Sequence, residues 1–226
     1  MVTLSVDATP DASPLSEVTM KGPLDIRRYL LDYDVPHEIV RLRRPVAHAT
    51  ELPEVLDISA DRVVVVHPFE ANDRSRRRLV VLMAPASTRL EPLGCHTVLA
   101  QLLREMFATP VVVAPASAEM VSRWTDYAAS HVAPLLLPAD VPVFATPALE
   151  ELGGTVVYTP TGDSGTALAI PAGDLITLAG ARIAPVETRN LIVLDRNRVV
   201  DVTRGPVSAR SAQHLTEGRP PLTAAI

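Results

Sequence analysis

Short apolar segments alternate with amphipathic segments along most of the chain. Apolar residues spaced by three and four positions predict helices, whereas runs of β-branched residues predict strands. The clearest helix is predicted at residues 94–107, and its apolar face is made by Val98, Leu99, Leu102, Leu103 and Met106. The clearest strand is predicted at residues 62–67, because its four consecutive valines are typical of a strand buried on both faces.

The other predicted elements are shorter and are bounded mainly by proline, aspartate and glycine. Helices are predicted at residues 23–34, 50–56, 117–127 and 171–178, with a helical turn at 147–151. Strands are predicted at residues 37–42, 79–83, 110–114, 141–145, 155–158 and 165–170, with a terminal hairpin at 191–194 and 199–202. Short turns join many neighbouring strands, so we expect partly antiparallel pairing. The pattern predicts an α/β fold with a mixed, curved β-sheet and helices packed on its outside.

The predicted elements form one continuous series that no low-complexity linker or internal repeat divides. We therefore expect a single domain over residues 22–204. Residues 1–21 are rich in Ser, Thr, Asp and Pro and are interpreted as a flexible arm, and residues 205–226 as a flexible tail. The terminal hairpin at residues 191–202 is expected to add strands to the edge of the sheet.

Composition narrows the classes of function. The 226 residues carry a formal net charge of -5, which argues against sequence-independent binding to DNA. The single cysteine, Cys95, excludes an intrachain disulfide and a cysteine-based zinc site. No spaced cluster of metal ligands is apparent, and no phosphate-binding loop, so we expect neither metal nor cofactor. Lys21 is the only lysine among the 21 lysine and arginine residues.

Neither a membrane-spanning segment nor a secretory signal is apparent in the sequence. No run approaches 18 apolar residues, and the first twenty residues contain three acids but no basic residue. We therefore expect a cytoplasmic protein that does not bind membranes. The sequence leaves the oligomeric state open, with a homodimer as one possibility.

Four stretches resemble a known family in order and local pattern: residues 26–40, 49–64, 127–144 and 156–186. The last stretch is the most specific, because several features follow one another in the family's order before a closing strand. They are Val156-Val157-Tyr158, a loop, Ala169-Ile170-Pro171 and Asp174-Leu175. Together they resemble the YbaK-type, prolyl-tRNA synthetase-associated editing domain over residues 24–186. The resemblance implies a barrel-like mixed sheet ringed by helices. It also implies metal-free hydrolysis of the ester that joins a wrong amino acid to tRNA.

The chain departs from the family at two positions that matter for this chemistry. Where the family carries a lysine on its second strand, this chain has Val65, or Val66 if the register slips by one. Where the family has a Gly-Gly-x-x-Pro loop, this chain reads Ser130-His131-Val132-Ala133-Pro134, so that only the proline is retained. Side chains in place of glycine add bulk where the aminoacyl group would approach the backbone.

The resemblance places the candidate pocket among the second strand, the Ser130–Pro134 loop and the Thr159–Ser164 loop. His131 and His67 are the candidate catalytic residues, since either imidazole could position or deprotonate water. Backbone N–H groups of the Ser130–Ala133 loop are the candidate oxyanion donors. The residues expected to line the pocket are Val65, Ser130, Ala133, Pro134, Thr159, Gly162, Asp163 and Ser164.

Each candidate also has a plain structural explanation. His131 could be an ordinary loop histidine, His67 a polar residue leaving the core, and Asp163 a turn residue. The arginine runs at residues 41–44 and 74–78 could contact tRNA phosphates or form solvated surfaces. The sequence therefore leaves two functions open: an aminoacyl-tRNA deacylase, or a catalytically inactive homologue that binds a small molecule, tRNA or protein.

Overall fold

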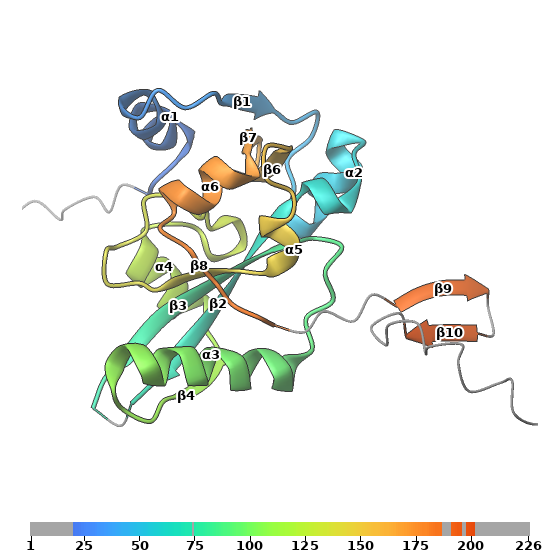
Figure 1. Ribbon diagram of the computed structural model, residues 1–226. Helices are drawn as coiled ribbons and strands as arrows, with labels where there is room; N and C mark the ends of the chain where they lie inside the picture. Colours follow the sequence, from blue (N-terminus) through green and yellow to red (C-terminus); the bar gives the residue numbers. More distant parts are fainter. Residues whose placement is uncertain (1–19, 74, 187–190, 196–197, 202–226) are drawn as a thin grey trace, which may run out of the picture.

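The computed structural model describes residues 20–73, 75–186, 191–195 and 198–201 (Figure 1). Its helices are α1 (Pro23–Asp32), α2 (Leu52–Leu56), α3 (Pro92–Phe107), α4 (Ala118–Thr125), α5 (Pro147–Glu150) and α6 (Ala172–Leu178). Short 3-10 turns occur at η1 (Ala49–Glu51), η2 (Ala60–Arg62) and η3 (Ala129–His131). The predicted arm and tail lie mostly outside the described residues.

Two sheets and a separate hairpin contain all the described strands. The smaller sheet has the order β1-β7-β6, with β1 (Glu38–Arg41), β7 (Thr166–Pro171) and β6 (Val156–Pro160) antiparallel. The larger sheet has the order β4-β2-β3-β5-β8 and contains β4 (Val112–Pro115), β2 (Val64–Asn72), β3 (Arg77–Pro85), β5 (Val143–Ala145) and β8 (Arg182–Ile183). The β3–β5 and β5–β8 pairs are parallel, whereas β2 pairs antiparallel with β3 and β4. The predicted mixed α/β fold is confirmed, although the two sheets do not close into a barrel.

A large core lies between the two sheets and is closed by helices. It takes side chains from both sheets and from α1, α4, α5 and α6, and we call it the central core. On the other side of the larger sheet, α3 crosses the long β2–β3 hairpin and buries Cys95, Leu99 and Leu103 against it (Figure 1). Of the predicted apolar face, Leu99 and Leu103 are buried and Val98 and Leu102 are partly buried against the same cluster, whereas Met106 is exposed.

Strand β2 separates these layers because its side chains alternate. Val64 and Val66 face the central core, whereas Val65 and Phe69 face the opposite side. Val63, Val64 and Val65 are all buried, as the run of valines predicts. The strands of this hairpin extend further than the predicted strands at 62–67 and 79–83, with β2 reaching Asn72 and β3 beginning at Arg77.

Several helix ends differ by about two residues from the predicted bounds, and α4 shows the local chemistry that sets them. The Ser117 hydroxyl accepts a hydrogen bond from the backbone N–H of Met120 at 3.2 Å, which caps α4. The helix ends at Thr125 rather than at residue 127, because Asp126 adopts a left-handed conformation with φ of 58°.

The terminal hairpin does not join the main sheet. β9 (Leu191–Asp195) pairs only with β10 (Arg198–Asp201) in a two-stranded sheet of its own. The prediction that this hairpin extends the sheet edge is therefore wrong, because β8 remains the last strand of the larger sheet. The apolar alternation that predicts the two strands correctly carries no information about their partner.

Candidate functional site

The two loops of the expected pocket meet at one residue that sequence reasoning missed. The backbone N–H of Val46 donates to the carbonyl of Ser164 at 2.9 Å. The Val46 carbonyl lies 2.9 Å from Nε2 of His131. The segment between β1 and η1 therefore links the loop after β6 to the loop that carries η3. A lone apolar residue between Pro45 and Ala47 gives no signal for this role.

His131 acts as a cross-link between loops. Its side chain is 7% exposed, Nε2 faces the Val46 carbonyl, and Nδ1 lies 2.8 Å from the Ser130 hydroxyl. A carbonyl only accepts hydrogen bonds, so Nε2 carries the hydrogen that joins the two loops. Both ring nitrogens are engaged, and to act on a substrate the imidazole would first have to give up a structural hydrogen bond.

Val65 lies in an apolar cluster and not beside polar groups. We call this the valine cluster; its buried members are Leu42, Val46, Ala49, Leu52, Val55, Val63, Val65 and Ala167. Val65 itself is 7% exposed. The place at which the resembled family carries a lysine is thus filled by hydrocarbon from the segment after β1, η1, α2 and β7.

His67 follows Val65 on the same face of β2 and has a different environment. It lies opposite Leu82 of the neighbouring strand β3 and is half-buried between the valine cluster and Phe69. Among the described residues its ring makes no hydrogen bond. Burial lowers the pKa of the His67 imidazole below its ordinary value. The side chain is therefore an uncharged imidazole at neutral pH, and neither of its nitrogens is hydrogen-bonded within the described residues.

The lowered pKa of His67 predicts a pH dependence of folding. Between the folded-state pKa and the unfolded value of about 6.5, the unfolded chain binds more protons. Above pH 6.5 the titration of His67 therefore does not lower the free energy of unfolding. As the pH falls from 6.5 to the folded-state pKa, protonation of His67 in the unfolded chain lowers that free energy. We expect His67→Gln to flatten the dependence of the free energy of unfolding on pH there, by at most about 1.4 kcal/mol per pH unit. Urea unfolding at a series of pH values measures this, and an unchanged slope would contradict it.

The loop between β6 and β7 is built by turn chemistry around one glycine. The Asp163 carboxylate accepts the backbone N–H of Gly165 at 2.7 Å, which is the turn role considered for it. Gly162 has φ of 90°, and a side chain there would collide with the Lys21 carbonyl and the Tyr127 ring. The Thr159 hydroxyl is fully buried and has no hydrogen-bond partner.

Lys21 fastens the other loop although it lies at the end of the predicted arm. Its ammonium donates to the carbonyls of Thr125 and Leu136 at 3.0 and 2.9 Å and lies 3.3 Å from the Asp126 carboxylate. The Tyr127 hydroxyl closes the same loop by donating to the Leu135 carbonyl at 3.0 Å. The arm was expected to be flexible through residue 21, whereas Lys21 is fixed to the segment that carries Ser130–Pro134.

The backbone of this fastened loop offers hydrogen-bond donors. The N–H of His131 is used by the Ala128 carbonyl. Within the part of the chain that the structure describes, no hydrogen bond uses the N–H of Val132 or Ala133, although both residues are buried. Buried backbone N–H groups are rarely left unpaired, so these two are the donors that a bound oxyanion could use.

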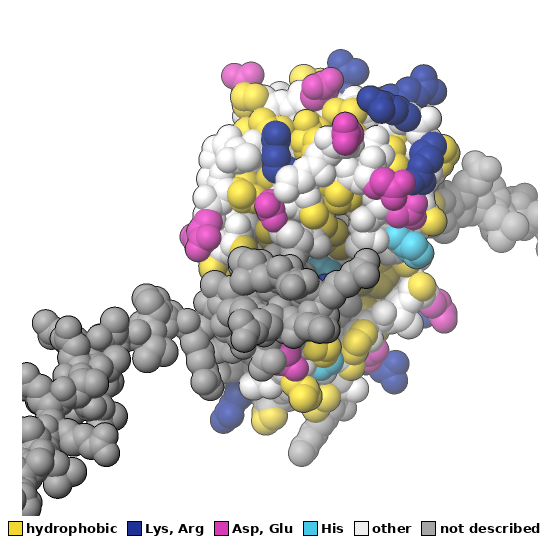
Figure 2. Space-filling view, turned by 90° about the vertical axis from the view of Figure 1, so that its right-hand side faces the viewer, with side chains coloured by type: hydrophobic (Ala, Val, Ile, Leu, Met, Phe, Trp, Pro, Cys, Tyr) yellow, Lys and Arg dark blue, Asp and Glu magenta, His cyan; other side chains and the backbone are white. Residues whose placement is uncertain are grey.

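Three of the six described arginines in the two arginine runs pair with acids. Arg44 pairs with Glu51 and Glu54 at 3.2 and 3.0 Å, Arg77 with Glu70, and Arg78 with Asp73. Basic and acidic side chains are interspersed on the face shown in Figure 2. These contacts favour the solvated-surface interpretation of the arginines. In the described ranges there is also no group of three metal-ligating side chains, and no helix has the length and hydropathy that a membrane crossing requires.

The fold of this chain is similar to the folds of solved structures. The hypothetical protein APE2540 matches with a TM-score of 0.55 and 20% identity, over 71% of this chain and 97% of its own. A proposed trans-editing enzyme for prolyl-tRNA synthetase matches with a TM-score of 0.54 and 18% identity, over 76% of this chain and 98% of its own. No family model and no curated protein sequence matches the chain. The chain therefore has an editing-domain-like fold.

Proposed function

We propose that this chain hydrolyses the ester bond of a mischarged aminoacyl-tRNA. The editing-domain-like fold and the description of one structural neighbour as a proposed trans-editing enzyme support the choice of substrate class. The observation that carries the proposal is His67. It is an uncharged imidazole with free nitrogens, two residues along β2 from the position at which the resembled family has a lysine.

The proposed reaction uses His67 as a general base. The imidazole takes a proton from water as the water oxygen attacks the ester carbonyl carbon. The negative charge that develops on the carbonyl oxygen requires a hydrogen-bond donor beside the ester. The intermediate then expels the ribose oxygen, which receives the proton back from the imidazolium. The products are the free amino acid and uncharged tRNA.

A second function is favoured by a different observation. Val65 lies in the valine cluster, and both ring nitrogens of His131 are engaged in holding loops. A chain that has lost the reactive groups of an editing site and filled their place could still bind its ligand. The second candidate is therefore a non-catalytic binding module for aminoacyl-tRNA.

One experiment separates the two functions. The purified full chain is incubated with tRNA-Pro charged with Ala, Ser or Cys, and ester hydrolysis is compared with the spontaneous rate. Hydrolysis above that rate supports the deacylase. No hydrolysis, together with tighter binding of charged than of uncharged tRNA, supports the binding module. Neither hydrolysis nor binding by the folded protein contradicts both.

If the chain is inert, restoring the lysine tests whether the pocket survives. Under the binding-module proposal, Val65→Lys is expected to create deacylation, because an ammonium would again lie on this face of β2. Val65→Met is the matched control, since it has a similar length without charge. Activity in both variants, or in neither despite a native thermal unfolding profile, would argue against a latent editing pocket.

A further inference from the structure

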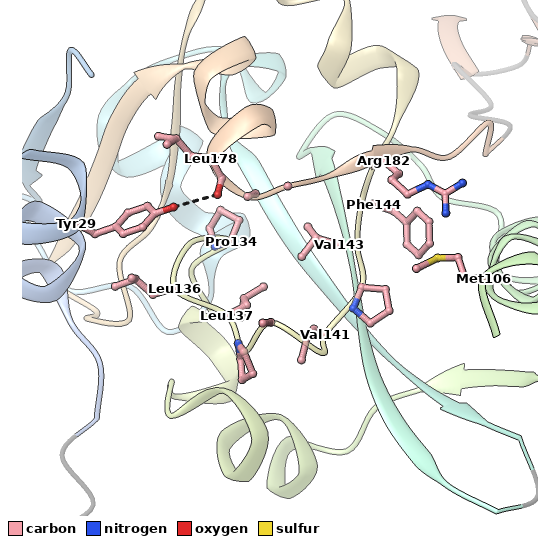
Figure 3. Close-up of a pocket in the computed structure, with 15 residues that line it drawn as sticks. Tyr29, Met106, Pro134, Leu136, Leu137, Val141, Val143, Phe144, Leu178 and Arg182 are labelled. Atoms are coloured by element: carbon pink, nitrogen blue, oxygen red, sulfur yellow. Dashed lines mark hydrogen bonds between the residues drawn. The ribbon is translucent and has the colours of Figure 1, made fainter. Parts of the chain in front are cut away.

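A cavity of about 510 Å³, which His67 does not line, lies between α1, the segment after η3, the end of α6 and strands β5 and β8 (Figure 3). Most of the described residues that line it have apolar side chains, although the wall surface is about as polar as it is apolar. Tyr29, Leu136 and Leu178 lie at one end, and Met106, Phe144 and Arg182 lie at the other (Figure 3). The volume is within the range of small-molecule sites, which are usually apolar with a few polar groups that orient the ligand.

The walls of this cavity are held in place by specific contacts. The Tyr29 hydroxyl donates to the Leu178 carbonyl at 3.2 Å and so ties α1 to the end of α6. Leu136 has φ of 57°, a conformation that costs a branched residue about 1–2 kcal/mol. Its carbonyl is held by the Lys21 ammonium at 2.9 Å. Strained backbone of this kind persists where the surrounding contacts over-determine it, often at binding sites.

The described residues that line the cavity carry positive charge and no negative charge. Among the described residues that line the cavity, Arg182 alone carries a formal charge and none is acidic. Arg182 is exposed, and no ion pair or hydrogen bond of its guanidinium occurs among the described residues. A guanidinium offers paired N–H donors that match a carboxylate. The cavity thus combines mostly apolar side chains and exposed backbone groups with one cation, Arg182, that is unpaired within the described residues.

We propose that this cavity binds a small organic carboxylate with an apolar body. The carboxylate pairs with Arg182, and the apolar body extends along the hydrocarbon walls toward Leu136 and Tyr29. Because the walls are already fixed, binding requires little ordering of the protein. His67 does not line this cavity, and the calorimetric test needs no hydrolysis, so the failure of either proposal can be told apart from the failure of the other.

The test uses octanoate and octanol as probes in isothermal titration calorimetry with the full chain. We expect octanoate to bind in the micromolar to low millimolar range. Arg182→Gln is expected to weaken octanoate at least tenfold and to change octanol less than threefold. Arg104→Gln is the matched control, because it removes an exposed arginine from the outer side of α3 and is expected to change neither probe.

A second variant tests the cavity itself. Ala179→Phe places a ring in the space beside Leu178 and is expected to weaken both probes at least tenfold while the thermal unfolding temperature stays within a few degrees. No binding of octanoate by the wild-type protein at 10 mM would overturn the proposal. Binding that survives both Arg182→Gln and Ala179→Phe would also overturn it, since the probe would then occupy another place.

Discussion

Replacing His67 with glutamine is expected to lower kcat/KM for deacylation by about 10²- to 10³-fold. Glutamine keeps a polar side chain of similar length but cannot take a proton from water, and general-base catalysis typically contributes an effect of this size. The loss should fall mainly on kcat, because the proton is transferred only as the transition state forms. Single-turnover deacylation of mischarged tRNA-Pro measures it directly.

The pH profile distinguishes a base from a residue that merely supports the fold. In the wild-type protein, activity should fall as the pH drops through the lowered pKa of His67, because only the uncharged imidazole accepts a proton. His67→Gln should remove that limb. His48→Gln is the control, because His48 is exposed, and it should leave both rate and profile unchanged. Equal activity in wild type and His67→Gln would exclude His67 as the base.

Gly162→Ala is expected to destabilise the fold by about 3 kcal/mol or more. Its φ of 90° is strained for any residue with a side chain. The added Cβ would also meet the Lys21 carbonyl and come within 2.7 Å of the Tyr127 ring. Both neighbours are fixed, Lys21 by its hydrogen bonds and Tyr127 by burial, so neither can move away cheaply. Denaturant unfolding measures the loss.

A substitution at a second glycine measures the cost of backbone strain without a steric collision. Gly180 has φ of 59°, and a Cβ there meets no atom within 4 Å. Gly180→Ala should therefore cost only the conformational part, about 1 kcal/mol. If Gly162→Ala costs no more than Gly180→Ala, the packing of the Gly162 turn against Lys21 and Tyr127 is not a rigid feature of the protein.

The position of the candidate site was only partly predictable. The sequence pattern placed Val65 and His67 on one strand, and alternation along that strand puts both on one face. The pattern could not predict whether the ring nitrogens of His67 or those of His131 would be without hydrogen bonds. That depended on the Val46 carbonyl, 85 positions from His131 along the chain, and on which loop approaches it.

The role of Lys21 shows the same limit. A lone lysine beside a polar, proline-rich segment has the composition of a flexible arm. Its ammonium is nevertheless bound by carbonyls 104 and 115 positions away. The terminal hairpin gives the opposite example, because its local pattern predicted two strands correctly but their expected sheet wrongly.

The sequence by itself determined the secondary structure, the mixed α/β class and the apolar faces. These depend on the spacing of side chains along one segment, which is a local property. The tertiary structure alone decided which polar groups are paired, which imidazole is free, and where a cavity with a single cation forms. Those features depend on contacts between segments far apart in the chain, and single-residue patterns do not record such contacts.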